Sequence, residues 1–546
     1  MGGSWLDRAA LALSPGWAQR RAEARLGVAR AEARMGAIRG YEAARMPARD
    51  LWRDRSGAPN DEVGGALARL RSRSRAMLRD NPYAKKMAFT TAGHQVGYGI
   101  RQRVKTDDKA TNQRTNKLFE TWAKRAVVGG QLDIFGLQHQ SAWARFESGE
   151  VLVRAVRLTM QEARARGLVV PLQFEVLEAD LLAGSLDSAG RALGPRVVQG
   201  VQFDRTGNRE GYWLLGAHPG ESAWSGTAGA RFWPASEVMH LYRAYAERPG
   251  TVRGVPDLTP SIARLWRLDD YEMAAIEQAR SQSMIGIIWE APDGGEVEVA
   301  TPGGVAGGSP ETQEPGGPGA PLEMYPGMVA SAPAGTKAHY LQPGSAGPFE
   351  PFSTHQLRAI AAGAGCTYDQ ATGDLRQANY SSLRAGRAEF RRLVEQDQWL
   401  MLIHQLCEPM WRLFVEVGTA SGALEDGEYP VTHMPPRIEL IDPSQDVPAL
   451  RSMRRLGLQT WQQQVMEQGY DPDEQAEELE EENADWDERG LILDGDPRRI
   501  SLSGGAHDPK QLAAVEIAAT GAAQPRRPDL AAQGAPPVAP FPRRAS

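Results

Sequence analysis

The sequence predicts an α+β protein with several parts, because helical and strand-like patterns occupy separate stretches of the chain. Apolar residues recur every three or four positions over 64–125, and again from 259 to about 284, as they do in helices. Runs that alternate apolar and polar residues over 150–245 indicate strands. With 546 residues, the chain is also too long for a single hydrophobic core.

Local signals mark two boundaries in these regions. The run RDNPYA (79–84) ends a helix, because Pro82 forces the preceding Asn81 out of the α region. In VVQGVQFDRTGNREGYWLLG, the residues Thr206–Asn208 separate two strand-like pieces, which predicts a hairpin. Each of these predictions depends only on residues that are neighbours in the sequence.

Residues 259–284 are predicted to form one long helix, of about 40 Å at a rise of 1.5 Å per residue. Thr259 is a favourable N-cap residue, and Pro260 suits the first helical position. Apolar residues cover more than one face of this helix, and they include Ile262, Leu265, Trp266, Leu268 and Ile276. We therefore expect it to pack on two sides, either as a core helix of one chain or between copies in a ring.

A tract rich in proline and glycine separates this helix from the next one. Strand-like pieces begin and end the region 285–350, and the tract at about 300–321 cannot form a packed core. A shorter helix is expected over 353–365, with Ser353 as its N-cap residue. This pattern predicts a small β-rich subdomain that carries a mobile insertion.

A polar loop precedes a long arginine-rich helix in TGDLRQANYSSLRAGRAEFRRLV (372–394). The loop combines one arginine, one offsetting carboxylate and short hydrogen-bonding groups, and its residues of interest are Asp374, Arg376, Gln377, Asn379 and Tyr380. Tyr380 and the hydroxyl groups of Ser381 and Ser382 are expected to cap the helix, which begins at about Ser382. Pro409 should kink this helix.

The two ends of the chain differ in composition. Residues 1–55 contain 11 arginines and six acidic residues, which predicts a solvated helix or an arm that meets an acidic partner or nucleic acid. Helices are expected over 444–486, where Thr460 and Gln463 form a capping box. Residues 503–546 are predicted to be disordered.

Bulk composition argues against several classes of protein. A net charge of −6 does not fit a general nucleic-acid-binding protein, whose surface would be strongly basic. The two cysteines, Cys366 and Cys407, provide neither a disulfide framework nor metal-ligand spacing. The first residues lack the features of a signal peptide, and no stretch has the roughly 18–20 apolar residues of a membrane span. We expect a soluble protein that is made in the cytoplasm.

The sequence contains no phosphate-binding loop, nucleophile elbow or HExxH zinc motif. Asp269 and Asp270 could bind nuclease metals, but adjacent helical residues point about 100° apart, so a solvated helix face is favoured. For His404 and Cys407 on one helical face, a packed core position is favoured over a metal site. The two carboxylates of EAD (178–180) have no evident partner and are interpreted as structural. We expect no catalysis, metal or cofactor.

Eight runs of sequence, in order between residues 40 and 475, carry a resemblance to a known family. They are GYEAAR (40–45), RDNPYA (79–84), LEADLL (177–182), FDRTGNREGYW (203–213), EVMHLYRAYAERPGTVRGVPDLTPSI (237–262), LDDYEMA (268–274), IAAGAGCTYDQATGDLRQANYSSLRAGRAEFRR (360–392) and YDPDE (470–474). Together they resemble the lambda-type portal proteins of tailed bacteriophages.

The resemblance implies a ring-forming portal fold whose parts occupy definite stretches of this chain. These parts are an N-terminal basic helical arm (1–63), a mixed α/β wing (64–258 and 383–445), two stem helices (259–284 and 353–366), a β-rich clip with the Pro/Gly-rich insertion (285–352), a tunnel loop (367–382), a long kinked helix within the second part of the wing, a helical crown (446–502) and a disordered tail (503–546). The five apolar residues of the first stem helix would then pack against neighbours in the ring.

The resemblance also implies a function. Twelve copies would form a ring at one vertex of the capsid, through which double-stranded DNA is packaged and later ejected. The implied partners are other copies of the chain, double-stranded DNA without sequence preference, the terminase large subunit, the major capsid and scaffold proteins, and a head–tail adaptor, with no membrane. The ring would nucleate procapsid assembly in the host cytoplasm and remain in the virion at the portal vertex.

In this interpretation the tunnel loop touches DNA only weakly. A duplex carries one charge per about 1.7 Å of its axis, so a ring of uncompensated arginines would hold a duplex that has to slide. Two other functions remain as alternatives. One is a metal-dependent DNA-processing enzyme that uses Asp269, Asp270 and the histidines, and the other is a monomeric head-assembly adaptor.

Overall fold

The computed structural model of the protein describes residues 57–187, 195–221, 229–283, 287–290, 337–340, 349–376, 379–436 and 442–491. In these residues, helices predominate and are joined by small antiparallel sheets, so the predicted α+β class is confirmed. The basic arm as far as residue 56, the Pro/Gly-rich insertion and the predicted tail lie outside the described residues. The chain divides into two compact units, Met1–Gly469 and Tyr470–Ser546.

Helices α3 (Pro59–Asp80) and α4 (Pro82–Val96) meet at Asn81, as the sequence predicts. Asn81 has an extended backbone that ends α3. Its side chain then caps α4 by accepting hydrogen bonds from the backbone N–H groups of Tyr83 and Ala84, both at 3.1 Å.

The helical pattern over 64–125 is interrupted, which the sequence does not predict. Strand β1 (Arg101–Val104) lies between α4 and α5 (Lys109–Ala123). Gly97 and Gly99 follow α4 with φ angles of +51° and +118°, which residues with a side chain rarely adopt, and so they stop the helix.

The main sheet has the strand order β3–β2–β8, with β2 (Glu150–Arg157) between β3 (Leu172–Glu178) and β8 (Val238–Tyr242). Both pairings are antiparallel, and Val151 lies opposite Glu178 on one side and Leu241 on the other. Helix α6 (Ile134–Ser148) leads directly into β2 and packs against it. The largest hydrophobic cluster of the described chain joins this sheet to the helices around it.

A second sheet is an antiparallel meander with the order β4–β5–β6–β7. Its strands are β4 (Arg196–Val198), β5 (Val201–Phe203), β6 (Arg209–Leu214) and β7 (Arg231–Pro234). The predicted hairpin between β5 and β6 is confirmed, because Asp204 Oδ1 accepts hydrogen bonds from the backbone N–H groups of Thr206 and Asn208, both at 2.8 Å. Short helices connect other strands, namely α7 (Met160–Ala165), η2 (Ala179–Leu181) and η3 (Ala244–Ala246).

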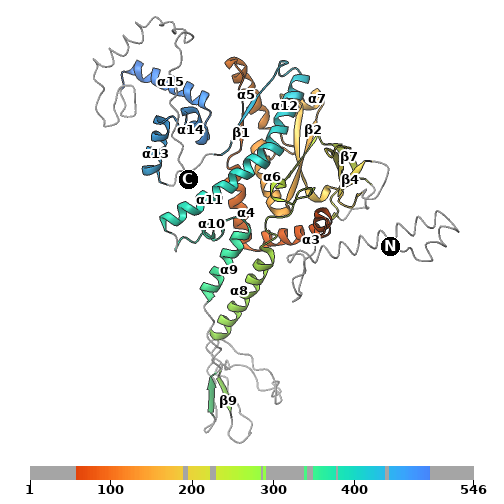
Figure 1. The fold of residues 1–546 in the computed structure, drawn as a ribbon, viewed down its shortest axis with the longest axis vertical. Coiled ribbons are helices and arrows are strands. Elements are labelled where there is room, and N and C mark those ends of the chain that lie inside the picture. Colours follow the sequence, from red (N-terminus) through yellow and green to blue (C-terminus); the bar gives the residue numbers. More distant parts are fainter. Residues whose placement is uncertain are drawn as a thin grey trace, which may run out of the picture. The chain divides into compact units, whose positions relative to one another are not determined.

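Two helices, α8 (Ile262–Ser283) and α9 (Phe349–Gly363), lie side by side (Figure 1). Strands β9 (Ile287–Glu290) and β10 (Lys337–Tyr340) lie between them in the sequence and pair antiparallel.

The expected N-caps of these two helices are wrong. The Thr259 hydroxyl donates to the Pro256 carbonyl at 2.6 Å, in a turn that precedes α8, and so Thr259 does not cap the helix. Helix α9 begins four residues earlier than expected, and Ser353 is buried inside it.

The long helix is continuous but irregular. Helix α11 (Tyr380–Asp397) passes into the π-helix η4 (Gln398–Cys407) and then into α12 (Glu408–Ala420). Pro409, where the sequence predicts a kink, lies at the start of α12. Proline has no N–H and its ring collides with the carbonyl four residues earlier. In η4 the backbone is wider, and the Glu408 N–H bonds to the Ile403 carbonyl, five residues back.

The remaining elements complete the first unit and part of the second. Strand β11 (Val431–Met434) pairs antiparallel with β1. Helices α13 (Pro443–Arg455) and α14 (Trp461–Glu467) follow, and the predicted capping box of Thr460 and Gln463 is confirmed. Helix α15 (Pro472–Arg489) belongs to the second unit. Among the described helices, none is both long and apolar enough to cross a membrane.

Candidate functional site

The polar loop after α10 (Tyr368–Thr372) is built from local turns. Gly373 ends α10 in the left-handed region, with φ +79°. The Thr372 hydroxyl accepts a hydrogen bond from the Asp374 N–H at 3.1 Å, and Asp374 Oδ1 accepts one from the Arg376 N–H at 3.0 Å. The loop is therefore held by hydrogen bonds between residues that are close together in the sequence.

Arg376 is paired with two carboxylates. Its Nε and Nη2 donate to the two oxygens of Asp374 at 3.0 and 2.9 Å, and Nη2 lies 3.1 Å from Glu350 Oε1 in the first turn of α9. The expectation that Asp374 offsets this arginine is thus confirmed. Hydrogen bonds from Arg376 hold the pKa of Asp374 well below its ordinary value, and the same contacts raise the pKa of Arg376. The pair is nevertheless open to solvent, because the Arg376 side chain is 73% exposed.

The cap of α11 differs from the expected one. Asn379 is the N-cap residue, and its Oδ1 accepts a hydrogen bond from the Ser382 N–H at 2.7 Å. The Ser382 hydroxyl accepts in return from the Asn379 N–H at 3.2 Å. The helix therefore begins at Tyr380, and Tyr380 and Ser381 are its first two residues rather than caps, because the amide of Asn379 already occupies that position. Gln377 and the side chains of Tyr380 and Ser381 lie outside the described part of the loop.

The apolar residues of α8 divide into two groups. Ile262, Leu265 and Leu268 are buried in a cluster with residues of α3 and α9 of the same chain. The expectation that these three residues pack between ring neighbours is therefore wrong, since the chain's own helices cover them. Trp266 and Ile276 remain 43% and 63% exposed.

A buried ionic cluster fixes the segment 251–258 that leads into α8, and we call this segment the stem root. Asp257 accepts hydrogen bonds from Arg145 Nη1 at 2.7 Å and from Arg243 Nη1 at 3.2 Å. Arg243 also donates to both oxygens of Asp397, the last residue of α11, at 2.9 and 2.7 Å. One arginine thus joins the root of α8 to the end of the helix that follows the polar loop.

Asp397 has further partners, which make its position over-determined. The Tyr245 hydroxyl and Gln95 Nε2 each donate to it at 2.6 Å. Burial raises the pKa of Asp397, but the hydrogen bonds and charge of Arg243, with the charge of Arg145, outweigh burial and leave the pKa below its ordinary value. The carboxylate is therefore ionised and held by groups from separate parts of the fold.

A second buried cluster holds the other end of the stem root. Glu150, at the start of β2, pairs with Arg71 of α3 and accepts from Arg253 Nε at 2.6 Å and from the Gly254 N–H at 2.9 Å. Burial raises the pKa of Glu150, but the two arginines and a hydrogen bond from His240 bring it well below its ordinary value. Arg253 also donates to the carbonyls of Gln199 and Ala179, so it connects the root to both sheets.

His240, in the middle of β8, completes this cluster as a neutral imidazole. Its Nε2 lies 2.8 Å from Glu150 Oε2 and its Nδ1 lies 2.7 Å from Arg209 Nη1. Because an arginine can only donate, Nδ1 is the acceptor and Nε2 carries the proton. Burial is the main reason why the pKa of His240 falls to about 4.

Close backbone contact fixes the stem root as well. Gly149, between α6 and β2, has φ +86°, and a Cβ there would lie 2.3 Å from the carbonyl carbon of Val255. Gly254 faces it, and a Cβ at that position would lie 2.2 Å from the Gly149 carbonyl oxygen. Only two glycines allow the chain segments to approach this closely.

The sequence interpretation missed these clusters. The sequence feature that could have revealed them is the run VMHLYRAYAERPGTVRGVPDL. It places His240 inside a strand that is buried along its whole length. Charged residues within such a run require buried partners. Those partners are distant in sequence, as Arg243 and Asp397 are separated by 154 positions.

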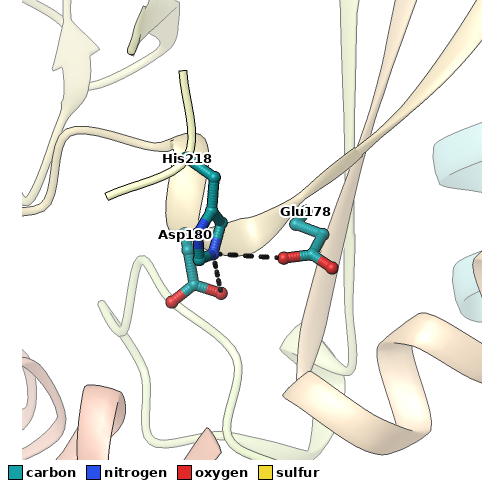
Figure 2. A group of neighbouring side chains, drawn as sticks. All are labelled: Glu178, Asp180 and His218. Atoms are coloured by element: carbon teal, nitrogen blue, oxygen red, sulfur yellow. Dashed lines mark ion pairs between the residues drawn. The ribbon is translucent and has the colours of Figure 1, made fainter. Parts of the chain in front are cut away.

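Glu178, Asp180 and His218 lie together, which corrects the expectation that the two carboxylates have no partner (Figure 2). His218 Nε2 is 3.3 Å from Glu178 and 4.0 Å from Asp180. Its Nδ1 accepts from the Gly220 N–H at 3.0 Å, so Nε2 carries the proton in this arrangement and does not offer a lone pair to a metal. Arg75, which pairs with both carboxylates, already lies where a cation would be held.

The other expected polar positions are simpler. Asp269 and Asp270 are exposed, which confirms a solvated helix face. Cys407 is buried, but His404 is exposed, so the expectation of a packed core position holds only for the cysteine. A π-helix turns more slowly than an α-helix, so the i,i+3 spacing no longer places both residues on one face.

Comparisons with known proteins complete these observations. The family model described as "Phage portal protein, lambda family" matches residues 46–398. Similar solved structures are the neck of an empty GTA particle computed with C6 symmetry (15% identity, TM-score 0.40, 81% of this chain and 99% of that chain covered) and the neck of a native GTA particle computed with C12 symmetry (15%, 0.41, 73% and 94%). The virion of a native gene transfer agent particle is also similar (15%, 0.37, 81% and 99%). No curated protein matches the chain.

Proposed function

Because the chain belongs to the lambda family of phage portal proteins, we propose that it assembles into a closed ring that conducts double-stranded DNA into and out of a capsid. Membership of the family makes it a structural, non-enzymatic component of a virion, located at the portal. The ring would contain twelve copies, as the resemblance of its sequence motifs implies.

The observation that carries the ring is a group of apolar side chains on α8 that the chain itself leaves exposed. Trp266, Met273 and Ile276 are 43%, 63% and 63% exposed, and they lie on one side of the helix. Burying a wholly exposed apolar side chain contributes about 1.5–3 kcal/mol, and covering each of these partly exposed side chains would contribute roughly half of that to an assembly. A monomeric adaptor would leave this face in water, so a second copy of the chain is its occupant in this proposal.

The proposed contact is one between two different surfaces rather than a symmetric pair. The exposed apolar side chains of α8 in one copy would meet another surface of the next copy. A contact between two different surfaces repeats from copy to copy, and it closes into a ring when the rotation fits.

In this proposal, the wing comprises 64–258 with 383–445, and α8 and α9 form the stem. The clip (285–352) would dock the terminase large subunit, and the crown would be 446–502. The wing would contact the major capsid and scaffold proteins during procapsid assembly, and a head–tail adaptor would join after packaging. The tunnel loop (367–382) would line the channel for DNA.

A pair of matched variants tests the role of α8. Ile276→Glu places a charge on the exposed apolar face, whereas Ala274→Glu places the same charge on another side of the same helix, about 200° away. We expect negative-stain images to show rings for the natural protein and for Ala274→Glu, and smaller particles for Ile276→Glu. Rings that persist in Ile276→Glu, with the helix content unchanged, would contradict this role of α8.

A further inference from the structure

The Arg376 guanidinium lies between carboxylates from two different segments. Asp374 belongs to the same loop, and Glu350 belongs to the first turn of α9. The group of three therefore carries one positive and two negative charges. Asp374 occupies the Nε and Nη2 edge of the guanidinium, which is an edge that a phosphate would use for a two-point contact, and Glu350 contacts Nη2 as well.

Asp374 is held in place before it meets Arg376. Its Oδ2 accepts a hydrogen bond from the Tyr368 hydroxyl at 3.2 Å, and its backbone N–H donates to Thr372. The Thr372 hydroxyl in turn donates to the Tyr368 carbonyl at 2.8 Å. The carboxylate is thus preorganised, and little entropy is lost when the arginine closes onto it.

Two arginines of α11, the helix that follows the loop, are also paired with carboxylates. Arg384 of α11 lies 3.0 Å from Asp446, and Arg391 lies 2.7 Å from Glu395. Pairing of arginine with carboxylate is therefore a repeated feature along α11, and Arg376 differs in having two carboxylates for one guanidinium.

We propose that Asp374 and Glu350 act as a latch on Arg376, which withholds its guanidinium from the phosphates of double-stranded DNA. This inference rests on the proposed function, in which the loop faces the duplex. With the latch closed, each loop presents a net negative charge and does not grip the DNA. Exposed ion pairs contribute only about 0.2–1 kcal/mol, so the latch opens easily and Arg376 makes brief rather than lasting phosphate contacts.

The role of Glu350 distinguishes this proposal from ordinary loop packing. A carboxylate in the first turn of a helix is stabilised by the helix dipole alone, which would explain Glu350 without any link to DNA. Under the latch, removing its charge frees the arginine. Each arginine that then contacts a phosphate adds about 0.9 to the slope of log affinity against log salt concentration.

The test measures binding of a short DNA duplex to the assembled protein at several salt concentrations. We expect Glu350→Gln to bind several-fold more tightly at low salt and with a steeper salt dependence than the natural protein. Glu395→Gln is the matched control, because it removes one carboxylate from the exposed Arg391 pair, and it should change binding much less. The double variant Glu350→Gln/Arg376→Gln should not show the tighter DNA binding of Glu350→Gln.

Equal effects of Glu350→Gln and Glu395→Gln would overturn the latch, as would a gain that survives Arg376→Gln, since both results indicate a general charge effect. Light scattering on the same samples reports the state of assembly. Absence of rings would count against the proposed function, whereas rings with no difference between the two variants would count against the latch alone.

Discussion

The stem root and the polar loop after α10 both depend on arginine–carboxylate pairs, but their surroundings are opposite. Beside the stem root, Asp397 is buried and accepts hydrogen bonds from three side chains of two distant segments, Gln95 from one and Arg243 and Tyr245 from the other. In the loop, Arg376 is mostly exposed, and one of its partners is only two residues away. A buried pair costs several kcal/mol to break, whereas an exposed pair exchanges easily. The first arrangement suits a fixed connection, and the second suits a contact that must be released.

Removing the carboxylate of Asp397 should have the largest effect on stability. Asp397→Ala leaves Tyr245 and Gln95 without their acceptor and Arg243 with a single carboxylate. We expect the free energy of unfolding, measured by urea denaturation, to fall by about 3–5 kcal/mol. Glu395→Ala, two residues earlier in an exposed pair, should cost less than about 1 kcal/mol. Similar losses in the two variants would mean that the cluster does not hold the stem root.

The buried histidine predicts how stability depends on pH. The pKa of His240 is about 4 in the folded chain, against an ordinary value of 6.5, so the unfolded chain binds a proton that the folded chain does not. The contribution of the neutral histidine to the free energy of unfolding is complete above pH 6.5 and is lost as the pH falls towards 4. The loss amounts to about 3 kcal/mol.

His240→Gln should remove most of this pH dependence, because glutamine can donate to Glu150 and accept from Arg209 without titrating. Urea denaturation at pH 7 and at pH 4.5 measures the difference. His404→Gln replaces an exposed histidine and serves as the control, and we expect its stability to fall between pH 7 and pH 4.5 as it does in the natural protein. An unchanged pH dependence in His240→Gln would show that another group is responsible.

Two glycine variants distinguish the cost of close packing from the cost of backbone strain, and the expected difference in stability between them is the smallest of these effects. Gly149→Ala and Gly207→Ala both place a side chain at positive φ, +86° and +95°. Only the first brings the new Cβ against another segment, since nothing lies within 4 Å at Gly207. We expect Gly149→Ala to lose about 1–3 kcal/mol more than Gly207→Ala in thermal or urea unfolding. Equal losses would indicate that the stem root can move away from Gly149.

The contrast between the two regions also explains what could be predicted from the sequence. The helix boundary at Asn81, the β5–β6 hairpin and the Asp374–Arg376 pair are local, and their residues are close together in the chain. The pairing of β1 with β11 and the ties of Asp397 are long-range, and sequence spacing carries no signal for them. For α8, the apolar pattern indicated extensive packing but not which residues the chain itself would cover.

The mass of the assembled protein in solution tests the central claim most directly. If the exposed face of α8 is covered by another copy, light scattering should give a single species of several hundred kilodaltons, many times the 59.5 kDa of one chain. A mass that stays near 59.5 kDa at high protein concentration would contradict the ring and leave the apolar face of α8 without an occupant.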